Sequence, residues 1–497
     1  MRMCSLALER LGEDTKHDGR RRELTALRCQ LEARTKCPIA GMPVELLLMV
    51  FDFVCRPVTV SLVCRRWREI ALSHHTLWHS LLLAESPKKA LHKLQEWCRR
   101  SRGQVQKLTI RKSLGSVVFI PLDGHHMLHP DDLLMRNKII VELRLLDLAH
   151  LKTCDLEDVD VAMVIAGLWG YKSSPSQQCL ETLSVSQTLP GRGPPFGCIE
   201  STVPVWTNIR ALKISNMLCH WTAFTGFVRG LTSFECKISD SPIDFVPIRY
   251  ILQANPTLEK LVVETKIGSR PQAVDVPEPL IMPHLHHVEL SGVALSPLST
   301  QNLSLPSLHV LRLSQLPGST MILENLVGDP GTSLAELVEL TMKNSSFQTI
   351  PLILALSCAP RLEVLQLSGD FDSNAVAESL SSQSPTLPLL PTFESRGHVF
   401  TELPILCPSL TVLDLSGSPN LRTGPVMRLV KERLGLAASQ DGGKYRLPGQ
   451  DNDRLVSSIR TLKLDGCPHI EAEILPWFRK NVPQFSCRYI TEKRMMR

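Results

Sequence analysis

Two histidine-rich segments are the first candidates for chemistry in this chain. They are His284-x-His286-His287 and His125-His126 with His129. Imidazole is a frequent ligand of zinc and other transition metals, so clustered histidines raise the question of a metal site. Neither segment has cysteine or carboxylate partners at a spacing that metal sites use, and His287 falls in a strand pattern. We therefore expect no metal site and no cofactor.

Two Cys-Pro pairs, Cys407-Pro408 and Cys467-Pro468, could supply reactive thiols. Both pairs fall at the junctions of a repeat described below, where a small buried side chain fits, so we interpret them as structural. The chain also lacks the G-x-S-x-G, G-x-x-x-x-G-K-S/T and H-E-x-x-H motifs of hydrolases, nucleotide-binding proteins and metalloproteases. An active site can be assembled without a local motif, so a hydrolase within the repeats stays an alternative. We expect a chain without catalytic residues.

Composition places the chain among globular proteins with more than one unit. Its 497 residues are 43% hydrophobic and 21% charged, and this length exceeds that of a usual single core. The formal net charge is +6, but six Lys or Arg against one Glu lie beyond residue 478, so the rest is nearly neutral. This balance does not favour nucleic-acid binding. Several of the 15 cysteines fall in predicted helices and strands, so we expect reduced thiols.

No segment of the sequence has the length and character of a membrane span. The N-terminus lacks the apolar core of a signal peptide, and the longest apolar run, Val161 to Trp169, is about half the length that crosses a bilayer. We expect no membrane partner and a location in the cytoplasm or nucleus.

The first strong structural signal in the chain is a predicted helix from Val44 to Val54 that is apolar on nearly every side. Between Val44 and Val54 only Glu45 and Asp52 are polar. A helix that lies on its own core needs an apolar stripe on one face only. The segment from Met42 to Leu81 is also too short to be a robust domain alone. We infer that this helix has two burial surfaces and that the second one meets another protein.

This segment resembles the F-box, the three-helix module by which substrate receptors of SCF-type cullin-RING ubiquitin ligases bind the ligase adaptor and, through it, the cullin. The matching residues are Pro43, Glu45, Leu46, Leu47, Phe51, Val63, Cys64, Trp67, Leu77 and Trp78. The family's acidic-Leu pair is replaced by Arg56-Pro57-Val58-Thr59 in a shortened segment, which leaves the start of the second helix open. The resemblance implies that the adaptor contacts Met42, Pro43, Leu46, Leu47, Val50, Phe51, Trp67 and Trp78, with both tryptophans shared between packing and interface.

Beyond this module the sequence repeats an apolar-x-x-apolar-x-apolar template. It recurs at Val105-Leu108-Ile110, Ile140-Leu143-Leu145, Leu180-Leu183-Val185, Ile209-Leu212-Ile214, Leu231-Phe234-Cys236, Leu258-Leu261-Val263, Leu285-Val288-Leu290, Leu308-Leu311-Leu313, Leu337-Leu340-Met342, Leu362-Leu365-Leu367, Leu410-Leu413-Leu415 and Ile459-Leu462-Leu464. From Leu180 to Leu362 the starts are 22 to 29 residues apart, a spacing typical of leucine-rich repeats. No unit covers its own apolar face, so the units must stack. The late segments from Leu413 and Leu462 resemble the cysteine-containing leucine-rich repeats that often accompany an F-box.

We therefore predict an α/β chain in which a small three-helix F-box precedes an irregular leucine-rich-repeat solenoid. The solenoid is expected to be a horseshoe of short parallel strands with helices or loops on its convex side. The predicted units are a polar, partly helical segment (1–37), the F-box (38–84), a linking helix (85–104), the solenoid (105–478) and a basic tail (479–497). Gly-, Pro- and Ser-rich insertions are expected near 189–204, 371–402 and 436–454.

In such a solenoid the outward positions of the strands line the concave surface, where a ligand is bound. The predicted target contacts are Glu235, Lys237, Glu264, Glu289, Val310, Arg312, Lys343, Val364, Val412 and Asp414. Charges of both signs are interleaved, which argues against a simple groove for polyanions. Val310, Val364 and Val412 share one template position. They form either an exposed apolar strip for a protein partner or a set of good strand formers.

The resemblance implies a substrate-recognition subunit of an SCF-type E3 ubiquitin ligase. Its F-box would bind the adaptor while its repeats hold a target protein for ubiquitination, so the chain itself would not be an enzyme. The alternative is an F-box and leucine-rich-repeat scaffold that binds the same adaptor without ubiquitin transfer.

Overall fold

The structure is a computed structural model of the chain, and its described part comprises two compact units. The described residues are 19, 22–27, 42–54, 57–111, 130–159, 161, 164–165, 168, 179–187, 208–216, 229–238, 245–265, 280–292, 303–316, 319–328, 334–381, 405–438, 444–446 and 453–488. Unit 1 is Met1–Ser80 with Glu96–Gly103, and unit 2 is Leu81–Gln95 with Gln104–Arg497.

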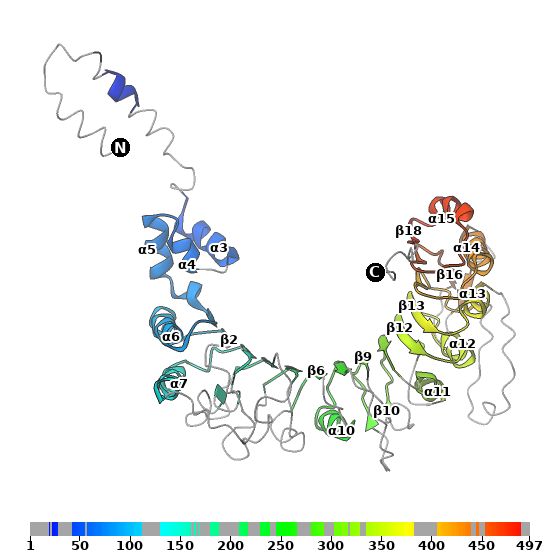
Figure 1. Cartoon of the computed structure of the whole chain (residues 1–497), viewed down its shortest axis with the longest axis horizontal. Helices are drawn as coiled ribbons and strands as arrows, with labels where there is room; N and C mark the ends of the chain where they lie inside the picture. The colour runs from blue at the N-terminus through cyan, green and yellow to red at the C-terminus, as the bar shows by residue number, and fades with distance from the viewer. Residues whose placement is uncertain are drawn as a thin grey trace, which may run out of the picture. The chain divides into compact units, whose positions relative to one another are not determined.

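Unit 1 contains three short α-helices followed by a 3-10 turn (Figure 1). They are α3 (Val44–Val54), α4 (Pro57–Ser61), α5 (Arg65–Ser73) and η3 (His75–Trp78). Pro57 begins α4, because proline has the backbone φ of a first helical turn and needs no hydrogen bond there. The second helix therefore exists despite the departure of this segment from the family pattern. Cys64 caps α5, since its Sγ accepts a hydrogen bond from the Trp67 amide at 3.5 Å.

The core of unit 1 is built on Leu47, Phe51 and Trp78, which are almost completely buried. Phe51 and Trp67 pack with ring centroids 4.8 Å apart, which joins α3 to α5. The indole Nε1 of Trp78 donates to the Ala71 carbonyl at 2.8 Å, so this buried ring has its polar atom satisfied. Trp97, on α6 (Pro87–Ser101), packs edge-on against Trp78 at 4.7 Å.

Unit 2 is organised by an open 14-stranded sheet. In spatial order its strands are β1 (Ser80–Leu83), β2 (Lys107–Arg111), β3 (Thr153–Glu157), β4 (Thr182–Ser186), β5 (Ala211–Ser215), β6 (Ser233–Ile238), β7 (Lys260–Thr265), β9 (His287–Ser291), β11 (Val310–Ser314), β12 (Glu339–Ser346), β13 (Val364–Asp370), β14 (Val412–Asp414), β17 (Thr461–Lys463) and β18 (Gln484–Ser486). The strand pairs from β2 to β18 are parallel, and the sheet does not close because β1 and β18 are its two edges. The predicted α/β class with short parallel strands is confirmed.

Helices of unit 2 lie on one side of this sheet (Figure 1). They are α7 (Pro130–Leu143), α10 (Phe245–Ala254), α11 (Ser319–Gly328), α12 (Thr349–Ser357), α13 (Ser373–Ser381) and α14 (Thr423–Ala438). η6 (Ala472–Ile474) and α15 (Leu475–Asn481) precede the last strand. Two further strand pairs, β8 (Leu280–Ile281) with β10 (Leu303–Ser304) and β15 (Lys444–Arg446) with β16 (Asp453–Leu455), stand apart from the large sheet.

The repeated template sets the register of the large sheet. The second apolar residue of one repeat is the direct strand partner of the second apolar residue of the next, as in Leu183 with Leu212. The third apolar residues pair in the same way, as in Val185 with Ile214. These side chains are buried, whereas most of those between them are half-buried or exposed. Alternation along each strand therefore separates an apolar core from a second surface, which we call the open face.

A left-handed residue follows many of the strands. The positions are Asp158, Asn216, Gly292, Gln315, Gly417 and Gly466. Each donates its backbone N–H to a carbonyl of the next repeat, for example Asn216 to Lys237 at 2.7 Å and Gln315 to Lys343 at 2.9 Å. Glycine, Asn and Asp tolerate this conformation best, which explains their recurrence within three residues of the strand ends.

One predicted repeat unit is wrong. Ile140-Leu143-Leu145 is not a strand, because α7 runs through Leu143 and Leu145 is exposed after it. The strand of this repeat is β3, and Leu151, Cys154 and Leu156 are the buried residues at its template positions. A spacing of three residues also fits one face of a helix, so the α7 residues mimic the template.

The expected boundaries also need correction. α13 and α14 extend into the insertions predicted near 371–402 and 436–454, and β15 pairs with β16 inside the second of them. β18 carries the sheet to Ser486, beyond the boundary expected at residue 478. The insertion near 189–204 and the histidines from His125 to His129 lie outside the described residues, as do most of 1–37 and the last nine residues of the tail. In the described part of the chain no helix is long and apolar enough to span a membrane.

Candidate protein-docking surfaces

The outer side of α3 is an apolar surface in contact with solvent. Leu46, Met49, Val50 and Phe53 follow one another at helical spacing and are all exposed, Phe53 to 91%. The inner side of the same helix buries Leu47 and Phe51, one turn apart. This helix therefore has two apolar sides, and unit 1 covers only one of them.

The exposed surface extends beyond α3 onto the next elements of unit 1. Val58 on α4, and Leu62 and Val63 in the turn that follows, are also exposed, Leu62 to 70%. The end of α4 is fixed by Arg68, whose Nε donates to the Ser61 carbonyl at 2.9 Å. Soluble proteins seldom leave so many large apolar side chains together in water without a partner.

The predicted adaptor contacts divide into two groups. Pro43, Leu46 and Val50 are exposed, and Met42 is half-buried where its carbonyl accepts a hydrogen bond from Arg66 at 2.7 Å. Trp67 is half-buried against Phe51.

Three of the predicted contacts need correction. Leu47, Phe51 and Trp78 have at most 1% of their surface exposed, so they hold unit 1 together from inside. A side chain without exposed surface does not offer contact area to a partner. Met49, Phe53, Val58, Leu62 and Val63 are exposed apolar residues that the predicted set did not include. The signal for the first two was present, because residues 46, 49, 50 and 53 share one helical face.

A comparison with protein-family models finds one match in this region. The model described as F-box-like matches residues 39–84. These residues form an F-box-like domain. The exposed apolar surface described above belongs to this F-box-like domain, whose module is associated with protein–protein interaction. A comparison of the chain with curated proteins gives no match.

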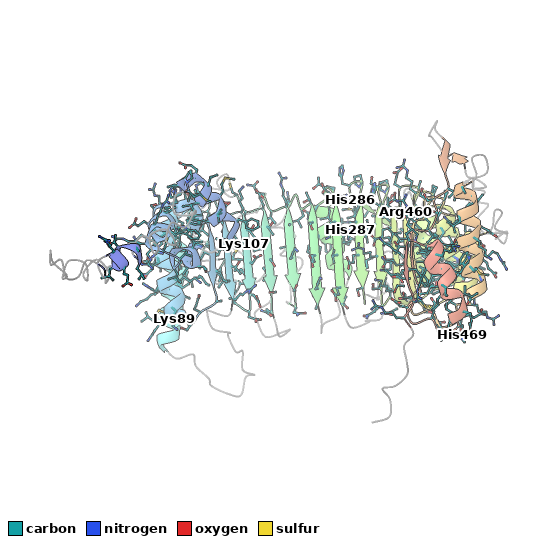
Figure 2. The ribbon with its side chains drawn as sticks, turned by 90° about the horizontal axis from the view of Figure 1, so that it is seen from above. Lys89, Lys107, His286, His287, Arg460 and His469 are labelled. Atoms are coloured by element: carbon teal, nitrogen blue, oxygen red, sulfur yellow. The ribbon has the colours of Figure 1, made fainter. Side chains whose placement is uncertain are left out.

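The open face of the large sheet carries the predicted target contacts. Figure 2 shows its strands side by side, with His287 at the start of β9 and His286 just before it. All ten predicted residues lie on the strands at positions that are half-buried or exposed. They do not form one surface of uniform chemistry, because ion pairs and strand register divide them.

Four residues of the open face form the first ion network. Glu235 on β6 lies 3.3 Å from the Nζ of Lys213 and 3.2 Å from that of Lys237. Lys237 also reaches Glu264 on β7 at 3.5 Å. Burial acts to raise the pKa of the Glu235 carboxyl, but the hydrogen bonds and charges of Lys237 and Lys213 outweigh it and hold the pKa below its ordinary value. These charges are largely satisfied by one another.

Arg312 is the centre of the second network. Its Nε and Nη2 donate to the two carboxylate oxygens of Glu339 at 2.7 and 3.0 Å, a two-point geometry that favours strong pairing. Its Nη1 lies 3.7 Å from Glu289. The hydrogen bond from Arg312 is the main reason that the pKa of Glu339 lies below its ordinary value. Glu339 is therefore a positioning partner of the predicted contact Arg312.

The three valines do not form one strip. Val310 and Val364 are separated by Glu339, which is the direct strand partner of both. Val364 and Val412 are direct partners on β13 and β14. Of these three valines, Val364 and Val412 are therefore the two that adjoin on the open face.

The candidate metal and thiol residues lie in separate places. His286 and His309 pack edge-on at 6.1 Å, and each Nδ1 faces a backbone carbonyl. Among the described residues no group of three or more His, Cys, Asp or Glu could hold a metal ion. Burial raises the pKa of the Cys407 thiol to about 12 and that of Cys467 to about 11, so both stay protonated. Their Sγ atoms donate to the carbonyls of Leu356 and Leu415.

Proposed function

We propose that this chain is the substrate-recognition subunit of an SCF-type E3 ubiquitin ligase. The F-box-like domain binds the ligase adaptor, and the sheet of unit 2, as a leucine-rich-repeat solenoid, holds a target protein on its open face. The observation that carries the proposal is the exposed apolar surface of the F-box-like domain, formed by α3, α4 and the turn after α4.

The size of this surface supports a stable partner. Full burial of a Leu, Val, Phe or Met side chain contributes about 1.5–3 kcal/mol. Phe53, Leu62 and Met49 are each at least 70% exposed, so a partner gains most of this contribution at all three. Aromatic residues and Met are also enriched at protein interfaces relative to the rest of the surface.

The repeat spacing and the register of unit 2 support the solenoid. Template starts 22 to 29 residues apart fall in the leucine-rich-repeat range. The repeats of β4, β5 and β6 each supply one short parallel strand in register with the next. In repeat proteins of this kind the extended surface created by stacking binds the partner.

The mechanism that follows is proximity. A target held on the open face presents its lysines to the ubiquitin-charged conjugating enzyme at a high effective concentration. Bond formation takes place on other subunits of the ligase, and this chain contributes binding and orientation. We propose on this basis that the chain is not itself an enzyme.

The test is adaptor co-purification with a double variant of the exposed surface. Pro43→Ala with Leu46→Ala removes contact area from two exposed residues without touching the core. We expect loss of adaptor binding with unchanged thermal unfolding. Ile350→Ala is the matched control, because Ile350 is an equally exposed aliphatic residue on α12 of unit 2. Adaptor binding that survives the double variant contradicts the proposal.

A second measurement separates the ligase from the scaffold alternative. A reconstituted ligase that contains this chain is tested for ubiquitin transfer to a protein captured by the open face. Transfer supports the recognition subunit. Stable adaptor binding with captured protein and no transfer supports the scaffold.

A further inference from the structure

Lys343 and Lys260 differ from the other charged residues of the open face that the structure describes, because neither makes an ion pair with a described residue; of the two, Lys343 lies nearer the apolar pair Val364 and Val412. Lys343 is exposed and is the last residue of β12 that pairs with β11. Its side chain makes no ion pair or hydrogen bond with any described residue. Its direct partner on β11 is Ser314, and that of Ser314 on β9 is Ser291, so the flanking side chains are neutral hydroxyls. The nearby cation Arg312, in contrast, is already paired with Glu339 and Glu289.

Carboxylates of the surrounding strands do not neutralise Lys343. Glu339 begins the same strand and is engaged by Arg312. Asp370 is the last residue of β13 and the strand partner of Ser346, which lies three positions beyond Lys343 on β12. Lys343 and Asp370 make no ion pair. Lys343 is thus an exposed positive charge with hydroxyl groups around it and no counter-ion among the described residues.

A β-bulge holds Lys343 in this position. The register of β12 and β13 shifts between Met342 and Ser345, and Asn344 adopts a left-handed conformation at the shift. The carbonyl of Lys343 accepts a hydrogen bond from the Gln315 amide at 2.9 Å, and the Asn344 amide donates to Ser368 Oγ at 3.3 Å. Bulges recur beside functional sites because they redirect a side chain.

Gly369 is the residue that permits this bulge. It has φ +135°, and a Cβ at this position would lie 2.2 Å from the Ser345 carbonyl oxygen. The backbones of β12 and β13 can approach this closely only because Gly369 has no side chain. The sheet therefore has a specific local structure at the point where it presents Lys343.

The apolar pair Val364 and Val412 lies on the same face at a definable distance. Val364 is the partner of Glu339, four residues before Lys343 on β12, and Val412 is one strand further. Strand geometry separates Lys343 from these valines by about 14–16 Å. An extended peptide covers this distance in about four or five residues. Gln366, between the two, offers a neutral amide.

We propose that the open face binds an extended acidic segment of the target, with a carboxylate side chain at Lys343 and an aliphatic side chain on Val364 and Val412. This inference rests on the proposed function and specifies the chemistry of the target that the open face recognises. Charge complementarity decides the occupant, because an unpaired ammonium among hydroxyls attracts an anion and repels a basic segment. The binding residues come from β12, β13 and β14.

The experiment selects peptides from a random library with the full-length protein in the presence of the adaptor. We expect bound peptides to be enriched in Asp or Glu four or five positions from Leu, Ile, Val or Met. Lys343→Glu should reverse the charge preference to Lys or Arg. Lys343→Met should weaken an enriched peptide about tenfold or more, as expected for a lost hydrogen bond between charged groups. Val364→Asn should remove the aliphatic preference and keep the acidic one.

Lys260→Met is the matched control, because Lys260 is an exposed lysine at the start of β7, outside the proposed site. It should leave both preferences unchanged. A wild-type protein without acidic enrichment, or a Lys343→Glu variant with the preference of wild type, overturns the inference. A parallel library with phosphoserine tests the source of the anion, and selection that needs phosphoserine overturns the carboxylate assignment.

Adaptor co-purification in the same samples keeps the two proposals apart. Peptide selection without adaptor binding contradicts the proposed ligase function alone. Adaptor binding without acidic selection contradicts this inference alone.

Discussion

Leu46 and Leu47 are neighbours on α3 and serve opposite surfaces: Leu47 has no exposed surface, whereas Leu46 is 49% exposed. Successive residues of a helix point about 100° apart, so a run of leucines reaches both sides. The inner side stabilises the F-box-like domain, and the outer side remains available for a partner.

This relationship predicts that two alanine substitutions differ strongly in their effect on stability. Leu47→Ala should lower the free energy of unfolding of unit 1 by about 2–5 kcal/mol, because it leaves a cavity in the core. Leu46→Ala should change it by about 0.5 kcal/mol or less, since its side chain already contacts water. Denaturant unfolding monitored by tryptophan fluorescence measures both. Equal destabilisation by the two variants would show that the helix faces are misassigned.

Gly369→Ala should be strongly destabilising. The new Cβ would lie 2.2 Å from the Ser345 carbonyl oxygen, and the backbone at φ +135° is unfavourable for any other residue. We expect a loss of about 2–3 kcal/mol or more in the free energy of unfolding. Gly417→Ala is the control, because it also has a positive φ but no atom within 4 Å of its Cβ, and should cost about 1–2 kcal/mol. A Gly369→Ala protein as stable as the control contradicts the close approach.

Gln315→Gly should stabilise unit 2 by about 0.5–1 kcal/mol. Gln315 has φ 54°, in the left-handed region that costs an L residue about 1–2 kcal/mol, and glycine removes this cost at some expense in chain entropy. Gln366→Gly, in the middle of β13, should destabilise by about 0.5–1 kcal/mol. Thermal unfolding of both variants distinguishes a turn position from a strand position. A lower midpoint for Gln315→Gly would contradict the turn conformation.

The ion pair of Arg312 and Glu339 predicts a pH dependence. The folded pKa of Glu339 is lowered, first by the hydrogen bond from Arg312. A carboxyl of this kind stabilises the fold above its unfolded pKa, about 4.3, and the contribution is lost as the pH falls through the lower folded value. Wild type should therefore lose more stability on acidification from about pH 6 to pH 3 than Glu339→Gln does. Urea midpoints measured across this range test it, with Glu259→Gln as a surface control. Parallel pH profiles for wild type and Glu339→Gln would contradict the pairing.

Much of the sheet could be predicted from sequence because its core positions recur. The template identifies β4 to β13 through residues such as Leu183, Leu261 and Leu365, which are fully or almost fully buried. The sequence-based assignment omits β3 and β18, although Leu151-Cys154-Leu156 and Val482-Phe485-Cys487 both fit the template, with cysteine or phenylalanine in place of leucine. It wrongly accepts Leu143 on α7, since three-residue spacing also suits a helix.

The docking surfaces were less predictable because contacts across elements decide them. The apolar composition of α3 indicates two buried sides, but the rotation of the helix decides that Leu47 faces inward and Phe53 outward. On the open face, Val310 and Val364 share a template position, yet Glu339 separates them because β12 lies between β11 and β13. Unit lengths do not reveal the bulge at Lys343, which depends on how Gly369 meets Ser345.

The most direct test of the central claim is hydroxyl-radical footprinting of the full-length protein with and without the ligase adaptor. Met49 and Phe53 are 70% and 91% exposed and should react readily in the free protein. The account predicts strong protection of both residues on adaptor binding and unchanged labelling of Tyr250, an exposed residue on α10 of unit 2. Equal labelling of Met49 and Phe53 with and without saturating adaptor would contradict it.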